Sequence, residues 1–136
     1  MANIRALLIC VLISTFAISG CSNDKQIVKL HLVKNDEITL SKGRTLEVSL
    51  DSNPTTGYTW IVSAISNHHV LQGNNVSRYI AGERATKGLV GAGGSEIFSF
   101  KAILEGTAKL IFRYARSWES EVKPVEEYVL QITVVS

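Results

Sequence analysis

The stretch TLEVSL, residues 45–50, alternates apolar and polar side chains. Leu46, Val48 and Leu50 would share one face of an extended chain, as in a strand with one buried side. Outward from it, six further segments show the same alternation or a high content of residues that favour strands. These segments are residues 27–33, 58–64, 76–81, 96–104, 107–115 and 125–135. No window carries an apolar stripe at helical spacing that competes with this pattern.

Seven strands separated by turn residues predict an all-β fold, an immunoglobulin-like antiparallel β-sandwich of seven to eight strands. If each strand runs opposite to its predecessor, the connections 51–57, 82–94 and 115–124 emerge at one end of the sandwich. The remaining connections would emerge at the other end. One of these, Glu105-Gly106, is interpreted as the tight turn of a hairpin between its two neighbouring strands.

The composition is that of one folded domain. The chain has 136 residues, of which 46% are hydrophobic, and a formal net charge of +2. This excludes a disordered chain and a two-domain enzyme. So small a charge gives little attraction for phosphates, so we expect no nucleic-acid partner. A monomer is the expectation for so short a chain.

The N-terminal residues are typical of an export signal. Arg5 precedes an uncharged apolar run at residues 6–18,. As a helix this run would span roughly 20 Å, short of the ~30 Å hydrocarbon core of a membrane. The following Ser19-Gly20-Cys21 resembles the bacterial lipobox, which implies cleavage before Cys21 and lipidation of its thiol.

We therefore expect a lipoprotein signal peptide at residues 1–20, a tether with lipidated Cys21 at 21–26 and the folded domain at 27–136. The protein would be exported to a bacterial cell envelope and anchored in a membrane. By resemblance to lipoproteins of two-membrane bacteria, Ser22 favours the outer membrane over the inner one. The alternative is an ordinary signal peptide that leaves Cys21 as an unmodified thiol.

The candidate catalytic and metal-ligating residues form no site. Both cysteines, Cys10 and Cys21, precede the domain, which excludes a disulfide, a thiolate zinc site and a cysteine nucleophile within it. Neighbours in an extended segment point to opposite faces, as in the pair His68-His69 and the pair Glu126-Glu127. His31 lies on the first strand, away from the three connections. We predict no enzyme activity, no cofactor and no metal.

The first of the three connections contains Asn53-Pro54-Thr55-Thr56-Gly57. Pro54 fixes φ, Asn53 can bond a downstream amide and Gly57 permits a positive φ, which together make a stiff turn. A turn alone does not explain two threonines at its tip.

The second connection, residues 82–94, has five glycines in thirteen residues. Loops of this length are functional or simply mobile, and both alternatives stay open here. Its segment Gly91-Ala92-Gly93-Gly94 would allow close approach of another surface to the backbone. The third connection carries Arg116-Ser117-Trp118. Trp and Arg are enriched at binding hot spots, although the indole could instead fold back onto the sandwich.

These three motifs, in this order and spacing, resemble those of the chagasin family of cysteine-peptidase inhibitors. The resemblance extends over nearly the whole mature chain. The one departure is Ser117, where the family has a proline between the arginine and the aromatic residue.

The resemblance implies a reversible, competitive inhibitor whose three loops straddle the active-site cleft of papain-like peptidases. Thr55 and Thr56 would cover the catalytic Cys and His, residues 91–94 would follow one wall, and Arg116 with Trp118 would hold the other. The predicted peptidase-binding residues are Asn53, Pro54, Thr55, Thr56, Gly57, Gly91, Ala92, Gly93, Gly94, Arg116 and Trp118.

A second hypothesis is a lipid-anchored immunoglobulin-like module that binds a non-peptidase partner in the envelope or on a surface through the same loops. Sandwiches host many unrelated functions, so the fold does not discriminate between the two. Binding to papain does, because a general adhesion module has no reason to bind a peptidase.

Overall fold

The computed structural model describes residues 27–136. The predicted signal peptide, the tether and Cys21 lie outside the described residues. Within the described residues the chain forms nine strands, one turn of 3-10 helix, η1, and one short helix, α1. In chain order these are β1 Ile27–His31, β2 Asp36–Ser41, β3 Thr45–Ser52, η1 Pro54–Thr56, β4 Thr59–Ile65, β5 Leu71–Gly73, β6 Arg78–Ala81, α1 Glu83–Thr86, β7 Gly94–Ala102, β8 Gly106–Ala115 and β9 Glu126–Val135.

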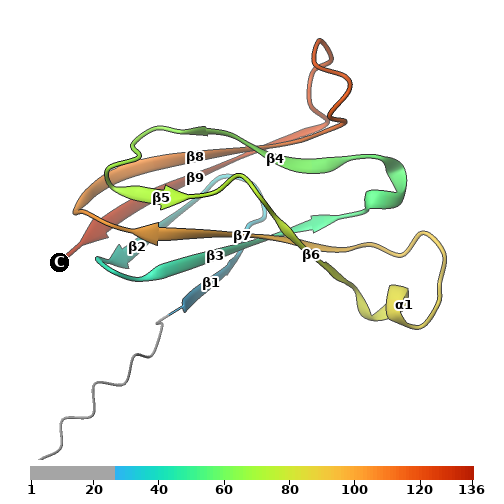
Figure 1. Cartoon of the computed structure of the whole chain (residues 1–136), viewed down its shortest axis with the longest axis horizontal. Helices are drawn as coiled ribbons and strands as arrows, with labels where there is room; N and C mark the ends of the chain where they lie inside the picture. The colour runs from blue at the N-terminus through green and yellow to red at the C-terminus, as the bar shows by residue number, and fades with distance from the viewer. Residues whose placement is uncertain (1–26) are drawn as a thin grey trace, which may run out of the picture.

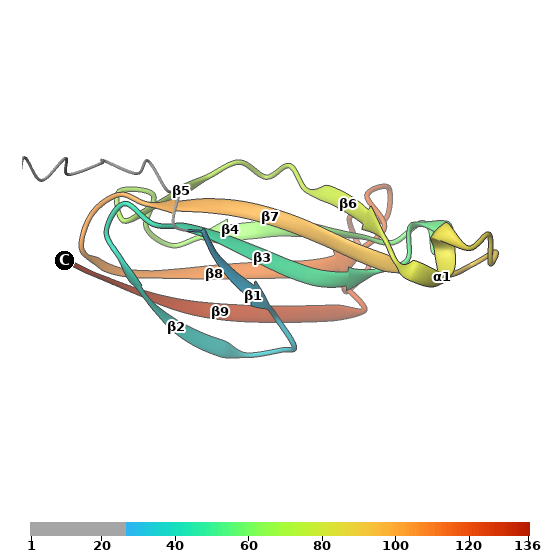
Figure 2. The same cartoon turned by 90° about the horizontal axis from the view of Figure 1, so that it is seen from below.

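The strands form two sheets that lie as two layers (Figure 2). One sheet has the order β1-β3-β7-β5, with β6 also paired to β7, and the other has the order β2-β9-β8-β4. Leu46, Val48 and Leu50 of β3 are fully buried between them, as their alternation predicted. Across the core, the ring of Phe112 in β8 lies 5.4 Å from that of Phe98 in β7. The predicted β-sandwich is confirmed.

The sheets are mixed rather than purely antiparallel, and their nine strands exceed the predicted seven to eight. Strand β1 pairs with β3, and β2 pairs with β9, both in parallel. The parallel pairing arises from the additional strand β2. This strand was not predicted because Ile38 and Leu40 are its only apolar residues and two acidic residues begin it. This strand reverses the chain once more between β1 and β3. The three residues of β5 are also too few to show a pattern.

The predicted hairpin at Glu105-Gly106 is wrong. Strands β7 and β8 belong to different sheets, so residues 103–105 carry the chain from one layer to the other. Gly106 is still required there: its φ is +138°, and a Cβ would lie 2.9 Å from the Val70 side chain. The hairpins on either side are β6–β7, which pairs Ala81 with Gly94, and β8–β9.

The three predicted loops do emerge at one end of the sandwich (Figure 1). They now correspond to the β3–β4, β6–β7 and β8–β9 connections. The opposite end holds Ile27, which pairs with Thr45 at the start of β3, whereas Ser52 at the loop end of β3 pairs with Gly94. Within residues 27–136, no helix has the length and apolar character needed to cross a membrane.

Candidate interaction site on three loops

The β3–β4 loop is closed on itself by short-range hydrogen bonds. The carbonyl oxygen of Asn53 accepts from the amide and the hydroxyl of Thr56, at 3.1 and 2.7 Å. The Thr55 hydroxyl donates to Asn53 Oδ1 at 2.6 Å. Gly57 ends the turn with φ +79° and donates to the carbonyl oxygen of Pro54. Pro54, Thr55 and Thr56 therefore form an exposed but rigid tip.

Asn53 also joins this loop to the β6–β7 loop. Its side-chain Nδ2 donates to the carbonyl oxygen of Gly91 at 3.0 Å, and its backbone amide donates to the Tyr114 hydroxyl at 3.0 Å. A Cβ on Gly93 would lie 2.9 Å from the carbonyl oxygen of Ser52, so the two loops are in close contact at their base. Gly94, predicted in the loop, is instead the first residue of β7. An open hollow of about 520 Å³ lies between the two loops.

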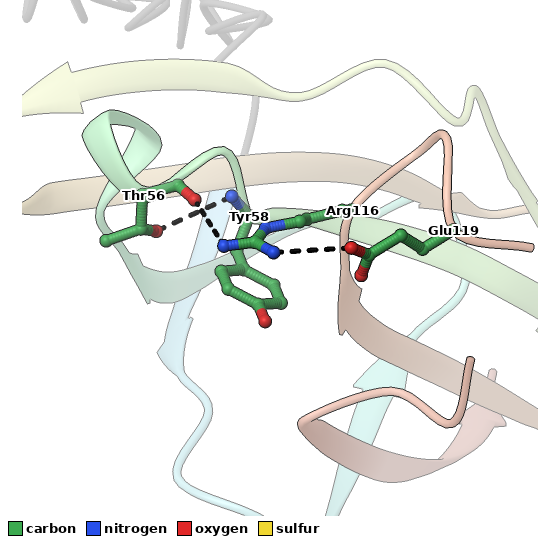
Figure 3. A network of polar contacts seen from close by, with 4 residues as sticks. All are labelled: Thr56, Tyr58, Arg116 and Glu119. Atoms are coloured by element: carbon green, nitrogen blue, oxygen red, sulfur yellow. Dashed lines mark hydrogen bonds and ion pairs between the residues drawn. The ribbon is translucent and has the colours of Figure 1, made fainter.

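Arg116 joins the tip to the β8–β9 loop (Figure 3). Its Nη2 donates to the carbonyl oxygen of Thr56 at 3.4 Å, and its Nη1 pairs with Glu119 at 3.3 Å. The guanidinium lies 4.4 Å from the centre of the Tyr58 ring, a cation–π contact,. Its Nε is buried and has no hydrogen-bond partner among residues 27–136. Arg116 is thus held between the loops, and only part of its side chain is available to a partner.

Trp118 stands at the tip of the β8–β9 loop and is 68% exposed. A Cβ on Gly57 would lie 2.8 Å from Trp118 Cη2. One edge of the indole therefore rests on the β3–β4 loop, and the rest of the ring faces outward. The indole is not folded back into the sandwich. So large an exposed aromatic group next to a rigid tip is typical of a binding hot spot.

Leu89 and Val90 belong to the same end of the molecule but were not predicted. They lie in the β6–β7 loop beside Gly91 and are 58% and 103% exposed. They were missed because the interpretation of this segment rested on its glycines. Two adjacent apolar residues between Gly88 and Gly91 were the available signal, because an apolar loop tip is unfavourable in water.

A cluster of aromatic rings in contact supports the loops from below. The ring of Tyr114 lies 5.5 Å from Tyr58 and 5.0 Å from Trp60, and Trp60 lies 4.8 Å from Tyr128. The indole nitrogen of Trp60 donates to the carbonyl oxygen of Asp51 at 2.7 Å, immediately before the loop. Tyr58 and Trp60 both pack against Tyr114, so their rings lie on one face. The pairing of β4 with β8, and of β8 with β9, brings Tyr114 and Tyr128 next to them.

The hydroxyl of Tyr128 donates to Glu126 Oε2 at 2.5 Å. This hydrogen bond, then burial and the negative charges of Glu126 and Asp51, raise the pKa of Tyr128 to about 12. The folded state therefore holds this proton more tightly than the unfolded chain, whose tyrosines have a pKa of about 10. The stabilisation is complete below about pH 10 and is lost as the pH rises toward about 12,.

Glu126→Gln is expected to lower the pKa of Tyr128 toward about 10, because the carboxylate that favours the protonated phenol is gone. A spectroscopic titration of tyrosinate absorbance measures this. Glu127→Gln is the matched control, since Glu127 pairs with Arg113 and not with a tyrosine. An unchanged titration of E126Q would show that the Glu126 contact does not set this pKa.

The candidate catalytic residues are dispersed. His68 and His69 are exposed in the β4–β5 connection. The prediction that His31 lies away from the three loops is wrong: because β1 runs parallel to β3, His31 lies on the surface 3.7 Å from Asp51, just before the β3–β4 loop. Glu126 bonds to Tyr128, whereas Glu127 pairs with Arg113, so the two carboxylates do not converge. Among residues 27–136, no three His, Cys, Asp or Glu side chains are grouped closely enough to hold a metal ion.

Comparisons with known proteins agree on one family. Residues 39–132 match the family model described as "Chagasin family peptidase inhibitor I42". That range contains all three loops. Amoebiasin-1 of Entamoeba histolytica is 33% identical over 84 residues, which are 62% of this chain and 76% of that protein. Chagasin of Trypanosoma cruzi is 26% identical over 98 residues, 70% of this chain and 86% of that protein.

Solved structures show the same fold. A cysteine protease inhibitor from Entamoeba histolytica superposes with a TM-score of 0.62 at 18% identity, covering 80% of this chain and 95% of that one. A protein named ICP from Leishmania mexicana gives a TM-score of 0.51 at 29% identity, covering 76% of this chain and 91% of that one. A protein named PbICP-C, solved in complex with falcipain-2, gives 0.54 at 20% identity, covering 81% and 99%.

Proposed function

Because the chain belongs to the chagasin family of peptidase inhibitors, we propose that it is a reversible, competitive inhibitor of papain-like cysteine peptidases. The family consists of inhibitors, not enzymes. One observation carries the proposal: the exposed tip Pro54–Thr56 is held between two flanking loops by the Asn53–Gly91 and Arg116–Thr56 hydrogen bonds. The complex of PbICP-C with falcipain-2 supports the choice of target class.

The tip would enter the active-site cleft. Its conformation is fixed before binding, so little entropy is lost when it is immobilised by a partner. The carbonyl oxygens of Asn53 and Pro54 already accept hydrogen bonds from Thr56 and Gly57. Cleavage of this segment would require its backbone to open, which these bonds oppose. Thr55 and Thr56 would therefore cover the catalytic Cys and His without being cut.

The other two loops would contact the walls of the cleft. Gly91–Gly94 with exposed Leu89 and Val90 would follow one wall, and Trp118 the other. Arg116 would act mainly by holding the tip, given its internal contacts. We expect an interface near the usual ~1,600 Å² of total buried surface, with most of the binding energy in a few exposed apolar groups.

Titration of papain with the purified protein tests this proposal. Residual activity on a small fluorogenic peptide is measured at several substrate concentrations after pre-incubation. We expect stoichiometric loss of activity, and an apparent inhibition constant that rises with substrate concentration as competition requires. If papain stays fully active with an excess of folded protein, the proposal fails and the non-peptidase binding module becomes the working hypothesis.

We further propose that Cys21 is lipidated and anchors the domain in the bacterial envelope, at the outer membrane where there are two membranes. The lipobox-like Ser19-Gly20-Cys21 motivates this. The position of Ile27 fits it, since Ile27 begins β1 at the end opposite the loops. An anchor there would leave the loops facing away from the membrane. The mass of the mature N-terminal peptide tests the idea: an unmodified Cys21, or cleavage elsewhere, would contradict it.

A further inference from the structure

Glu96 is a buried carboxylate in β7, only 3% exposed, and lies beneath the β3–β4 loop. None of the ion pairs found among residues 27–136 involves it. Burying a charge without a counter-ion is costly unless hydrogen bonds replace water. Four residues donate such bonds to it: Ser52, Thr59, Trp60 and Ser77. All four are donors, so the carboxylate oxygens have hydrogen-bond partners without a counter-ion,.

Three of these donors lie at the ends of the β3–β4 loop, one at the first end and two at the second. Ser52 is the last residue of β3, and its hydroxyl lies 2.6 Å from Glu96 Oε1. Thr59 and Trp60 open β4; the Thr59 hydroxyl lies 3.0 Å from Oε2, and the Trp60 amide lies 3.1 Å from Oε1. The fourth donor, Ser77, precedes β6, and its hydroxyl lies 2.8 Å from Oε2.

The two ends of this loop belong to different sheets. Strand β3 lies in the sheet of β7, whereas β4 is the edge strand of the other sheet and pairs only with β8. No ladder of backbone hydrogen bonds therefore sets the distance between Ser52 and Thr59. Glu96 bonds to both, and charge-assisted hydrogen bonds of this kind are roughly twice as strong as neutral ones.

We infer that Glu96 is a positioning residue for the inhibitory tip: its carboxylate fixes the separation of Ser52 and Thr59 and thereby holds residues 53–58 in their binding geometry. The effect on affinity rests on the proposed function. The effect on loop order does not, because it concerns the free protein. Preorganisation of this kind increases affinity by lowering the ordering cost of binding.

The test compares variants of the full chain. Glu96→Ala would leave a cavity with unpaired donors and could prevent folding, so the key variant is Ser52→Ala with Thr59→Val, which removes two donors from the loop ends. Ser77→Ala is the matched control, since it removes one donor to the same carboxylate outside the loop. Glu96→Gln keeps the shape of the side chain and part of its hydrogen bonding. Its amide exchange rates and its affinity should therefore lie between those of S52A/T59V and those of S77A.

The first measurement is amide hydrogen exchange of Thr56 and Gly57 in the free protein, because these amides close the turn. We expect exchange to be faster by about tenfold or more in the S52A/T59V variant and near wild type in S77A, a tenfold change being about 1.4 kcal/mol of local opening. Wild-type exchange in S52A/T59V, or equally fast exchange in S77A, would overturn the inference.

The second measurement is inhibition of papain by the same variants. We expect S52A/T59V to bind about 10- to 100-fold more weakly and S77A to stay within about threefold of wild type, as ordering of a loop costs affinity without changing its contacts. Unchanged affinity in S52A/T59V would contradict a positioning role. If wild type itself fails to inhibit papain, the proposed function fails, and the exchange comparison still decides the part played by Glu96.

Discussion

Trp118→Ala is expected to weaken the inhibition of papain by at least about 100-fold, equivalent to about 2.7 kcal/mol. The indole is 68% exposed and rests by one edge on Gly57, so it contributes little to the core and has a large apolar surface to bury in a complex. The melting temperature should stay near that of the wild type. Inhibition constants and thermal unfolding of both proteins provide the measurement.

Leu104→Ala is the matched control for this substitution. Leu104 is also a large exposed apolar residue, 47% exposed, but it lies in the β7–β8 connection at the opposite end of the sandwich. Its removal should leave inhibition within about twofold of wild type, as is usual for residues outside an interface. If L104A weakened inhibition as much as W118A, or if W118A inhibited normally, the placement of the hot spot on the β8–β9 loop would be wrong.

Gly57→Ala is expected to disturb both the tip and the hot spot. The residue has φ +79°, where an L-amino acid other than glycine is strained by about 1–2 kcal/mol,. Its new Cβ would also lie 2.8 Å from Trp118 Cη2, so the indole must move. We expect a small loss of stability together with a loss of affinity of about 10- to 100-fold, since both the tip and the hot spot are displaced.

Gly43→Ala is a control that separates the strain at a positive φ from the contact with Trp118. Gly43 has φ +84° in the β2–β3 turn, but no atom lies within 4 Å of the position that its Cβ would take, and the turn is at the end opposite the loops. G43A should lose a similar free energy of unfolding and keep its affinity. Denaturant unfolding and papain titration of both variants give the comparison. Equal affinity of G57A and G43A would show that the contact between Gly57 and Trp118 does not matter for binding.

The fold could be predicted where the sequence pattern is local. The alternation at residues 45–50 placed Leu46, Val48 and Leu50 correctly in the core. Strand β2 was missed because its two apolar residues are too few to stand out, and without it the parallel pairing of β1 and β3 could not be foreseen. The turn at Gly106 looked like a hairpin because local residues do not encode which sheet the next strand joins.

The candidate site was predictable to the same extent. Turn-forming residues and a tryptophan in a loop identified the three loops, and strand parity brought them to one end. The contacts that hold them together join residues far apart in the chain, such as Asn53 with Gly91 and Arg116 with Thr56. Glu96 was missed, although the alternation in this strand puts it on the same buried face as Phe98 and Phe100. What the sequence does not reveal is that Glu96's neighbours in space donate hydrogen bonds to it.

Protection of papain's catalytic thiol from alkylation tests most directly whether the three loops occupy the active-site cleft. Papain is mixed with an excess of the protein and exposed briefly to iodoacetamide, and the modified fraction is read by mass spectrometry. We predict that the thiol is protected in proportion to the complex formed, and that W118A removes most of the protection at the same concentration. If the thiol is alkylated at the rate of free papain while the complex is intact, the protein binds elsewhere and does not block the cleft.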